Sequence, residues 1–230
     1  MFARFTLEII RSIVNTMASS VQSGSTPLNW KDGTLPAGLE DVRMPMPEDE
    51  GPKRALVVSA HPDDSEFGAA GTVYQWTKEG WEFYYLICTD GSKGSEDPAW
   101  TPDRLVPTRK DEQRAAAAVL GVKEVFFLDN VDGELTYNKD FMREVVRKIR
   151  QLKPHACFGH DPGQIVRNMF INHPDHRAAG ETLLDAVYPL ARNRPSFPEL
   201  LEEGLEPFSV KEVYLWTKHY NPDWCSIEKK

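Results

Sequence analysis

Two short segments, far apart in the chain, carry the residues best suited to chemistry. One is His61-Pro62-Asp63-Asp64 and the other is His173-Pro174-Asp175-His176. Each joins a His-Pro-Asp tripeptide to a further metal-binding side chain, Asp64 in the first and His176 in the second. A catalytic zinc ion takes a few nitrogen and oxygen donors and keeps one position open. The two segments together could supply such a set.

The metal hypothesis assigns His61, Asp64 and His176 as the ligands, because two imidazoles and one carboxylate are a common catalytic zinc set. Zinc lowers the pKa of a coordinated water towards about 7 and polarises a carbonyl oxygen. Since neighbouring side chains point differently, Asp63 stays free to act as a general base.

His173 is expected to complete the chemistry. With Asp175 as the group that orients it, His173 could stabilise an oxyanion and later protonate a leaving amine. This division of roles suits metal-assisted hydrolysis of an amide.

A structural explanation of the same residues remains open. Proline after a strand and aspartate at a helix start are ordinary turn and cap residues, so one His-Pro-Asp tripeptide is a weak signal. Of the other histidines, His155 and His219 are expected to be surface or packing residues. His160 is either a support for the site or a structural histidine.

Hydrophobic periodicity predicts strands that alternate with helices. Strands are expected at residues 55–60, 82–89, 124–128, 156–159 and 210–217, and helices at 66–79, 107–120, 141–152 and 174–191. This alternation is typical of a three-layer α/β/α fold with a mainly parallel sheet. Ligands of such folds bind beyond the carboxyl ends of the strands, where both His-Pro-Asp segments are placed.

The globular domain is expected to span residues 54–230, after an N-terminal extension over residues 1–53. Residues 1–14 fit a short amphipathic helix, and they are too few and too charged for a membrane span. The remainder of the extension is rich in Ser, Gly, Pro and acidic residues, which indicates an irregular lead-in.

Composition narrows the partners and the compartment. The chain has 27 Lys and Arg against 35 Asp and Glu, a formal net charge of −8, which argues against nucleic acid as a partner. The three cysteines, Cys88, Cys157 and Cys225, form no CxxC pair. Reduced, mostly buried thiols and a cytoplasmic location are therefore expected.

Residues 60–72, AHPDDSEFGAAGT, resemble the AHPDDxExGxGGT signature of the LmbE/PIG-L family of zinc-dependent de-N-acetylases. The similarity continues through residues 89–94, 109–112, 120–122, 132–135 and 161–162, and through 173–180 in the second segment. It runs from about Arg54 to Trp216, which is most of the chain.

The resemblance implies a Rossmann-like fold that removes an N-acetyl group from a glucosamine-containing small molecule. It implies the same roles as the residue chemistry: Zn²⁺ on His61, Asp64 and His176, Asp63 as general base, and His173 with Asp175 at the oxyanion and the leaving amine. It adds Arg109 as a substrate-binding residue, for which a salt bridge with Glu112 is the structural alternative.

Two other functions stay open. The same zinc site could act as an amidase on a thiol conjugate or another acylated metabolite, because loops set the substrate of such a fold. A non-enzymatic nucleotide- or sugar-binding module is less favoured, because residues 68–71 do not form GxGxxG and follow two carboxylates that would repel a pyrophosphate.

Family members commonly continue past the Asn221-Pro222 region into another helix. The wall of the active site built there is expected to be absent, shorter or supplied by a neighbouring subunit, and a homo-oligomer is one expectation.

Overall fold

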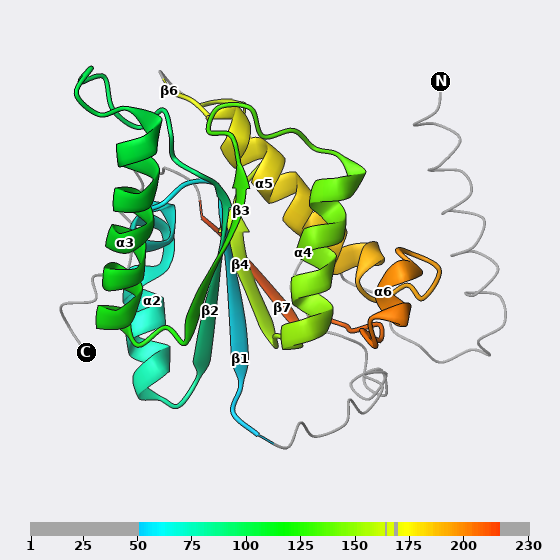
Figure 1. Cartoon of the computed structure of the whole chain (residues 1–230). Helices are drawn as coiled ribbons and strands as arrows, with labels where there is room; N and C mark the ends of the chain where they lie inside the picture. Colours follow the sequence, from blue (N-terminus) through cyan, green and yellow to red (C-terminus); the bar gives the residue numbers. More distant parts are fainter. Residues whose placement is uncertain (1–50, 164, 168–169, 217–230) are drawn as a thin grey trace, which may run out of the picture. The chain divides into compact units, whose positions relative to one another are not determined.

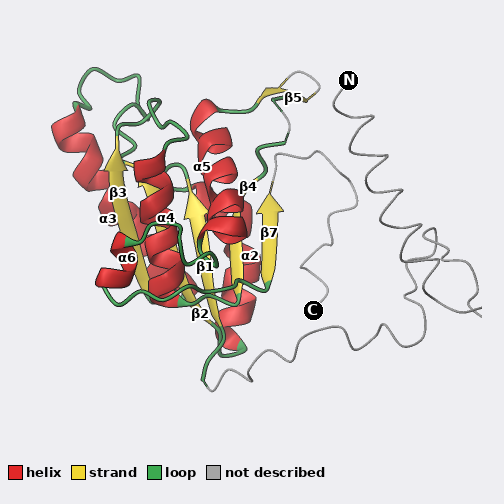
Figure 2. Cartoon of the chain, turned by 90° about the vertical axis from the view of Figure 1, so that its right-hand side faces the viewer, coloured by secondary structure: helices red, strands yellow, loops and turns green. Residues whose placement is uncertain are grey.

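A computed structural model of the chain describes residues 51–163, 165–167 and 170–216. Its main feature is a parallel sheet with the strand order β3-β2-β1-β4-β7 (Figures 1 and 2). The strands are β1 (Arg54–Ser59), β2 (Glu82–Thr89), β3 (Glu124–Asn130), β4 (Ala156–His160) and β7 (Glu212–Trp216). This architecture confirms the predicted three-layer α/β/α fold.

Helices cover both faces of this sheet. They are α2 (Asp64–Lys78), α3 (Pro102–Leu120), α4 (Lys139–Leu152), α5 (Pro174–Asp185) and α6 (Glu199–Glu202). Figure 1 shows α2 and α3 on one face and α4 and α5 on the other. A two-residue antiparallel pair, β5 (Val166–Arg167) with β6 (Phe170–Ile171), lies between β4 and α5 in the chain.

The central strand β1 explains the two layers of core. Its side chains alternate between the faces of the sheet. Leu56 and Val58 belong to the cluster beneath α4 and α5, while Ala55 and Val57 belong to the cluster beneath α2 and α3. Because both faces are covered, β1 reads as a continuous apolar run, as expected for a buried parallel strand.

Two helices differ from the predictions at their ends. Helix α3 begins at Pro102 instead of residue 107, because Pro102 suits the first turn and Pro107 is tolerated inside the helix. Helix α5 ends at Asp185 and not at residue 191. A π-helical stretch, η1 (Ala186–Leu190), follows it. Tyr188 has non-helical backbone angles, because a residue that precedes a proline, here Pro189, disfavours the α-helical conformation.

The structure also bears on the predicted strand bounds, the cysteines and the membrane span. Strand β2 has the predicted bounds, and β7 begins at Glu212 instead of residue 210, while residue 217 lies outside the described residues. Helix α6 and the β5–β6 pair were not predicted. Cys88 and Cys157 are free and buried, and Cys225 lies outside the described residues. None of the described helices is both long and apolar enough to cross a membrane.

The predictions for residues 1–50 lie outside the described residues, so the division at residue 54 stays a prediction. Within the described part, β1 begins at Arg54.

A close approach between α5 and the end of β4 fixes the position of α5 on the sheet. A Cβ atom at Gly180 of α5 would overlap the backbone carbonyl oxygen of His160 and press on Pro162. Only glycine lets the helix lie this near the end of β4, and the first turn of α5 carries the second His-Pro-Asp segment.

Gly180→Ala is therefore expected to push α5 away from β4 and to lower the free energy of unfolding by about 1–3 kcal/mol. Chemical denaturation measures this change. Glu181→Ala at the adjacent exposed position is the control and should change stability by less than about 0.5 kcal/mol. Equal stability of the two variants would contradict the close contact.

Candidate metal centre

The carboxyl ends of the strands carry a cluster of histidines and aspartates. His61 follows β1, Asp132 follows β3, and His160 is the last residue of β4. Asp64 is the first residue of α2, and His176 lies in the first turn of α5. These segments meet at the rim of the sheet where parallel α/β folds bind ligands.

The three predicted metal ligands lie at mutual distances that suit one ion. Nδ1 of His61 is 3.2 Å from Oδ2 of Asp64 and 3.3 Å from Nε2 of His176. Nε2 of His176 is also 3.3 Å from Oδ1 of Asp64. Tetrahedral zinc with bonds of about 2.0–2.2 Å separates its ligand atoms by about 3.3–3.6 Å. The donor set therefore fits a small divalent cation.

The Asp64 carboxylate is the centre of this cluster. It accepts a hydrogen bond of 2.8 Å from the backbone N–H of His61, and its oxygens face the rings of His61, His160 and His176. Burial alone would raise the pKa of Asp64, but its close contacts with the rings of His160, His176 and His61 hold the pKa well below its usual range. Asp64 is thus kept as an anion, the form that binds a metal.

The second ring nitrogen of His61 faces two further carboxylates. Nε2 lies 3.1 Å from Oδ1 of Asp132 and 3.1 Å from Oδ2 of Asp175. Burial would lower the pKa of His61, yet hydrogen bonds with Asp132, Asp175 and Asp64 raise it to about 11. A carboxylate on the far nitrogen is the usual way to orient a metal-binding histidine.

The structure gives Asp175 a different partner from the one predicted. Its carboxylate is fully buried and accepts the backbone N–H of Gly133 at 2.7 Å and of Leu135 at 3.2 Å, besides facing His61. The link to His173 runs instead through the backbone, since the N–H of Asp175 donates to Nδ1 of His173 at 3.2 Å. The cause is the helix: His173 caps α5, so its Nδ1 turns back to the first turn.

His160 and His173 each use one ring nitrogen as a hydrogen-bond acceptor. Nε2 of His160 accepts the backbone N–H of Ala60 at 3.1 Å, and Nδ1 of His173 accepts that of Asp175. Burial lowers the pKa of both rings. Both are therefore neutral, and these two nitrogens have no free lone pair for a metal.

The carboxylate of Asp63 pairs with Arg109, whereas that of its neighbour Asp64 joins the cluster of histidines. Its side chain is 48% exposed, against 13% for Asp64, and its Oδ2 lies 2.6 Å from Nη2 of Arg109. Arg109 also donates to the carbonyl oxygen of Pro62 at 2.8 Å and contacts Glu112 at 3.3 Å. The predicted substrate-binding arginine thus has three protein partners at this rim.

Asp132 was not among the predicted site residues, although it takes part in the cluster. The available signal was its position, because it stands in the loop directly after β3 and precedes Gly133, which has a φ of 77°. For His160 the sequence left two alternatives open, a residue that supports the site and a structural histidine. The structure places its ring 4.0 Å from that of His176 in a stacked arrangement.

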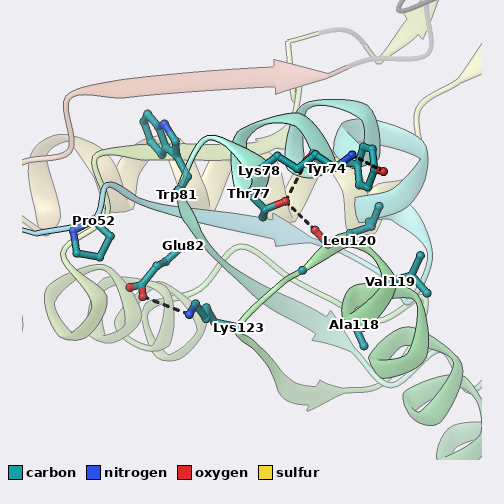
Figure 3. A pocket seen from close by; sticks show the side chains of 12 residues that line it. Pro52, Tyr74, Thr77, Lys78, Trp81, Glu82, Ala118, Val119, Leu120 and Lys123 are labelled. Atoms are coloured by element: carbon teal, nitrogen blue, oxygen red, sulfur yellow. Dashed lines mark hydrogen bonds and ion pairs between the residues drawn. The ribbon is translucent and has the colours of Figure 1, made fainter.

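A pocket of about 450 Å³ lies at the opposite ends of the strands (Figure 3). The start of β2 and the last turns of α2 and α3 line it, with Trp81, Thr77 and Leu120 among the residues. It holds none of the clustered histidines and aspartates. Because the side chains able to bind a metal lie at the carboxyl ends of the strands, the candidate site is there and not in this pocket.

A parallel α/β fold with a His–Asp cluster at its strand ends defines a candidate metal-dependent enzyme. Residues 56–187 match the family model for PIG-L, described as GlcNAc-PI de-N-acetylase. This match covers more than half of the chain, and so the chain belongs to the PIG-L/LmbE family.

Individual relatives agree with this assignment. A diacetylchitobiose deacetylase of Thermococcus kodakarensis is 34% identical over 73% of this chain and 61% of its own length. A probable N-acetyl-alpha-D-glucosaminyl L-malate deacetylase of Bacillus anthracis is 30% identical over 63% of this chain and 64% of its own.

Among solved structures, the N,N'-diacetylchitobiose deacetylase of Pyrococcus horikoshii superimposes with a TM-score of 0.68 at 29% identity. The match covers 73% of this chain and 61% of that one. The chain thus spans a little over 60% of the length of these relatives.

The raised pKa of His61 makes a prediction about metal binding. Binding at Nδ1 removes one proton from a ring that is otherwise doubly protonated, so affinity should rise with pH. Between about pH 7.5 and 9, where an ordinary imidazole is already neutral, the zinc affinity should rise about tenfold per pH unit. Titration calorimetry of chelator-treated protein, in buffers of different ionisation enthalpy, counts the protons released.

Asp132→Asn is the matched variant for this measurement, because it weakens the contact that raises the pKa of His61. It should release fewer protons per bound ion at about pH 8 and give a shallower pH dependence. No proton release by the unmodified protein at this pH would show that His61 is neutral before the metal binds.

Proposed function

We propose that the chain is a metal-dependent hydrolase that removes an N-acetyl group from a small molecule containing N-acetylglucosamine. The observation that carries this proposal is the mutual spacing of His61, Asp64 and His176, together with a second carboxylate, Asp63, that stays out of the ligand set. Zinc is the proposed ion because two imidazoles and a carboxylate at this spacing suit it.

The bound ion would lower the pKa of water and polarise the acetyl carbonyl. Asp63 is the proposed general base, since its carboxylate is 48% exposed and lies outside the proposed ligand set. Arg109, 2.6 Å from this carboxylate, holds it in place. The substrate-binding role of Arg109 requires that part of its guanidinium remain available at the rim.

His173 is proposed to stabilise the oxyanion. Because Nδ1 accepts the backbone N–H of Asp175, the neutral ring carries its proton on Nε2 and can donate it in a hydrogen bond. The same hydrogen bond disfavours a proton on Nδ1. The structure therefore supports the oxyanion role of His173 more directly than the delivery of a proton to the leaving amine.

The relatives named above support an N-acetylated amino sugar as the substrate class. The chitobiose and malate deacetylases act on different molecules that share an acetylated glucosamine. No feature of the described residues favours the thiol conjugate, so amide cleavage in such conjugates serves as a test of the alternative.

Purified protein loaded with zinc is expected to bind about one ion per chain and to release acetate from N-acetylglucosamine, diacetylchitobiose or a glucosaminide conjugate. An enzyme-coupled acetate assay over this panel measures turnover. Cleavage of an acylated thiol conjugate without acetate release from any sugar would replace the proposed substrate class.

Asp63→Asn should keep the bound zinc but lower kcat by about 100- to 10,000-fold, because it removes the base and not a ligand. His176→Ala should instead lose the metal, as measured by atomic absorption after gel filtration. Asp111→Asn, at an exposed aspartate of α3 that pairs with Arg114, is the control and should keep normal turnover. Robust activity of Asp63→Asn would remove Asp63 from the role of base.

A further inference from the structure

The backbone at Asp63 has an unusual conformation. Its φ of 89° and ψ of −23° place it in the left-handed region, which a residue other than glycine seldom adopts. Asp63 occupies the N-cap position of α2, yet its side chain makes no capping hydrogen bond. This conformation separates the directions of Asp63 and Asp64, so that one faces Arg109 and the other faces the histidines.

Two side chains of α3 hold the peptide unit that sets this conformation. The C=O of Pro62 and the N–H of Asp63 belong to one peptide bond. Arg109 donates to the carbonyl at 2.8 Å, and Oε1 of Gln113 accepts the N–H at 2.7 Å. These residues lie four apart on α3, hence on one face of the helix. Rotation of this peptide, which would change φ of Asp63, breaks both hydrogen bonds.

Gln113 is itself fixed by a carboxylate. It is 2% exposed, and its Nε2 donates to both oxygens of Glu66, at 2.9 and 3.1 Å. A backbone N–H only donates a hydrogen bond, and the nitrogen of a side-chain amide cannot accept one, so the oxygen of Gln113 must face the N–H of Asp63. The amide of Gln113 therefore has a single orientation that satisfies both neighbours, with Oε1 towards Asp63.

We infer that Gln113 is a positioning residue for the proposed hydrolysis. Oriented by Glu66, it holds the Pro62–Asp63 peptide so that the Asp63 carboxylate faces the substrate side of the rim while Asp64 faces the metal ligands. The hydrogen bonds of Gln113 run to Asp63 and Glu66, neither of which is a proposed ligand, and it acts through the backbone of Asp63. This inference rests on the proposed function only for its kinetic readout.

Reversing the polarity of the Gln113–Glu66 pair provides the sharpest test. Gln113→Leu removes the acceptor for the N–H of Asp63, and Gln113→Glu keeps that acceptor but sets two carboxylates against each other. In the double variant Gln113→Glu with Glu66→Gln, the new carboxylate at position 113 can accept both the N–H of Asp63 and the new amide at position 66. The hydrogen bond from the N–H of Asp63 is then kept, and the bond between positions 113 and 66 is restored with its donor and acceptor exchanged.

Gln113→Leu and Gln113→Glu are expected to lower kcat by about 10- to 100-fold, with KM and zinc content close to those of the unmodified enzyme. The double variant should recover kcat to within about threefold of the unmodified value. Crystal structures should show Asp63 leaving the left-handed region in Gln113→Leu and returning to it in the double variant.

Ala117→Gly is the matched control, because Ala117 is buried one turn further along α3. It should lower the midpoint of thermal unfolding and leave kcat and the conformation of Asp63 unchanged. An equal loss of kcat in Ala117→Gly would assign the effect to general destabilisation and overturn the inference.

Two further results would overturn it. One is an unchanged Asp63 conformation and kcat in Gln113→Leu, and the other is a double variant no better than Gln113→Glu. If the unmodified protein releases no acetate, the proposed function fails, and the conformation of Asp63 in the crystal structures then decides the role of Gln113. If Gln113→Leu does not fold, Gln113→Glu and the double variant decide it.

Discussion

The Asp64 carboxylate holds the candidate site together. It faces three imidazoles, from the loop after β1, from the end of β4 and from the first turn of α5. A largely buried carboxylate is costly unless charge and hydrogen bonds compensate it. The backbone N–H of His61 and the surrounding rings supply that compensation. The cluster thus requires segments distant in the sequence to end at one point.

The fold meets this requirement through a few close contacts. β1 lies between β2 and β4 in the centre of the sheet and brings His61 to the rim. Gly180 lets α5 approach the end of β4, which brings His176 beside His160. On the other face, α3 holds the turn between β1 and α2 through Arg109 and Gln113. Each face of the sheet therefore positions one of the two His-Pro-Asp segments.

Much of this arrangement could be predicted from the sequence. The apolar runs predicted the strands, and parallel topology predicted that loops after β1 and β4 would meet the start of α5. The spacing of the two segments then suggested the donors His61, Asp64 and His176, which the structure brings within 3.3 Å of one another. Their role as metal ligands stays a prediction.

The partners of those donors could not be predicted. Asp175 and Asp132 lie on different elements, and only their approach to Nε2 of His61 shows that they orient the same ring. The hydrogen bond between Gln113 and the backbone of Asp63 depends on which face of α3 meets the turn between β1 and α2. A glutamine in an alanine-rich helix does not reveal that contact. Such contacts follow from three-dimensional packing, whereas residue types and hydrophobic periodicity follow from the sequence.

A crystal structure of the zinc-loaded protein, with anomalous data collected at the zinc absorption edge, tests whether His61, Asp64 and His176 bind one ion. We expect one strong peak at bonding distance, about 2.0–2.2 Å, from Nδ1 of His61, Nε2 of His176 and an oxygen of Asp64. A peak bound by His173 or His160 in place of these atoms, or between Asp132 and Asp175, would contradict it.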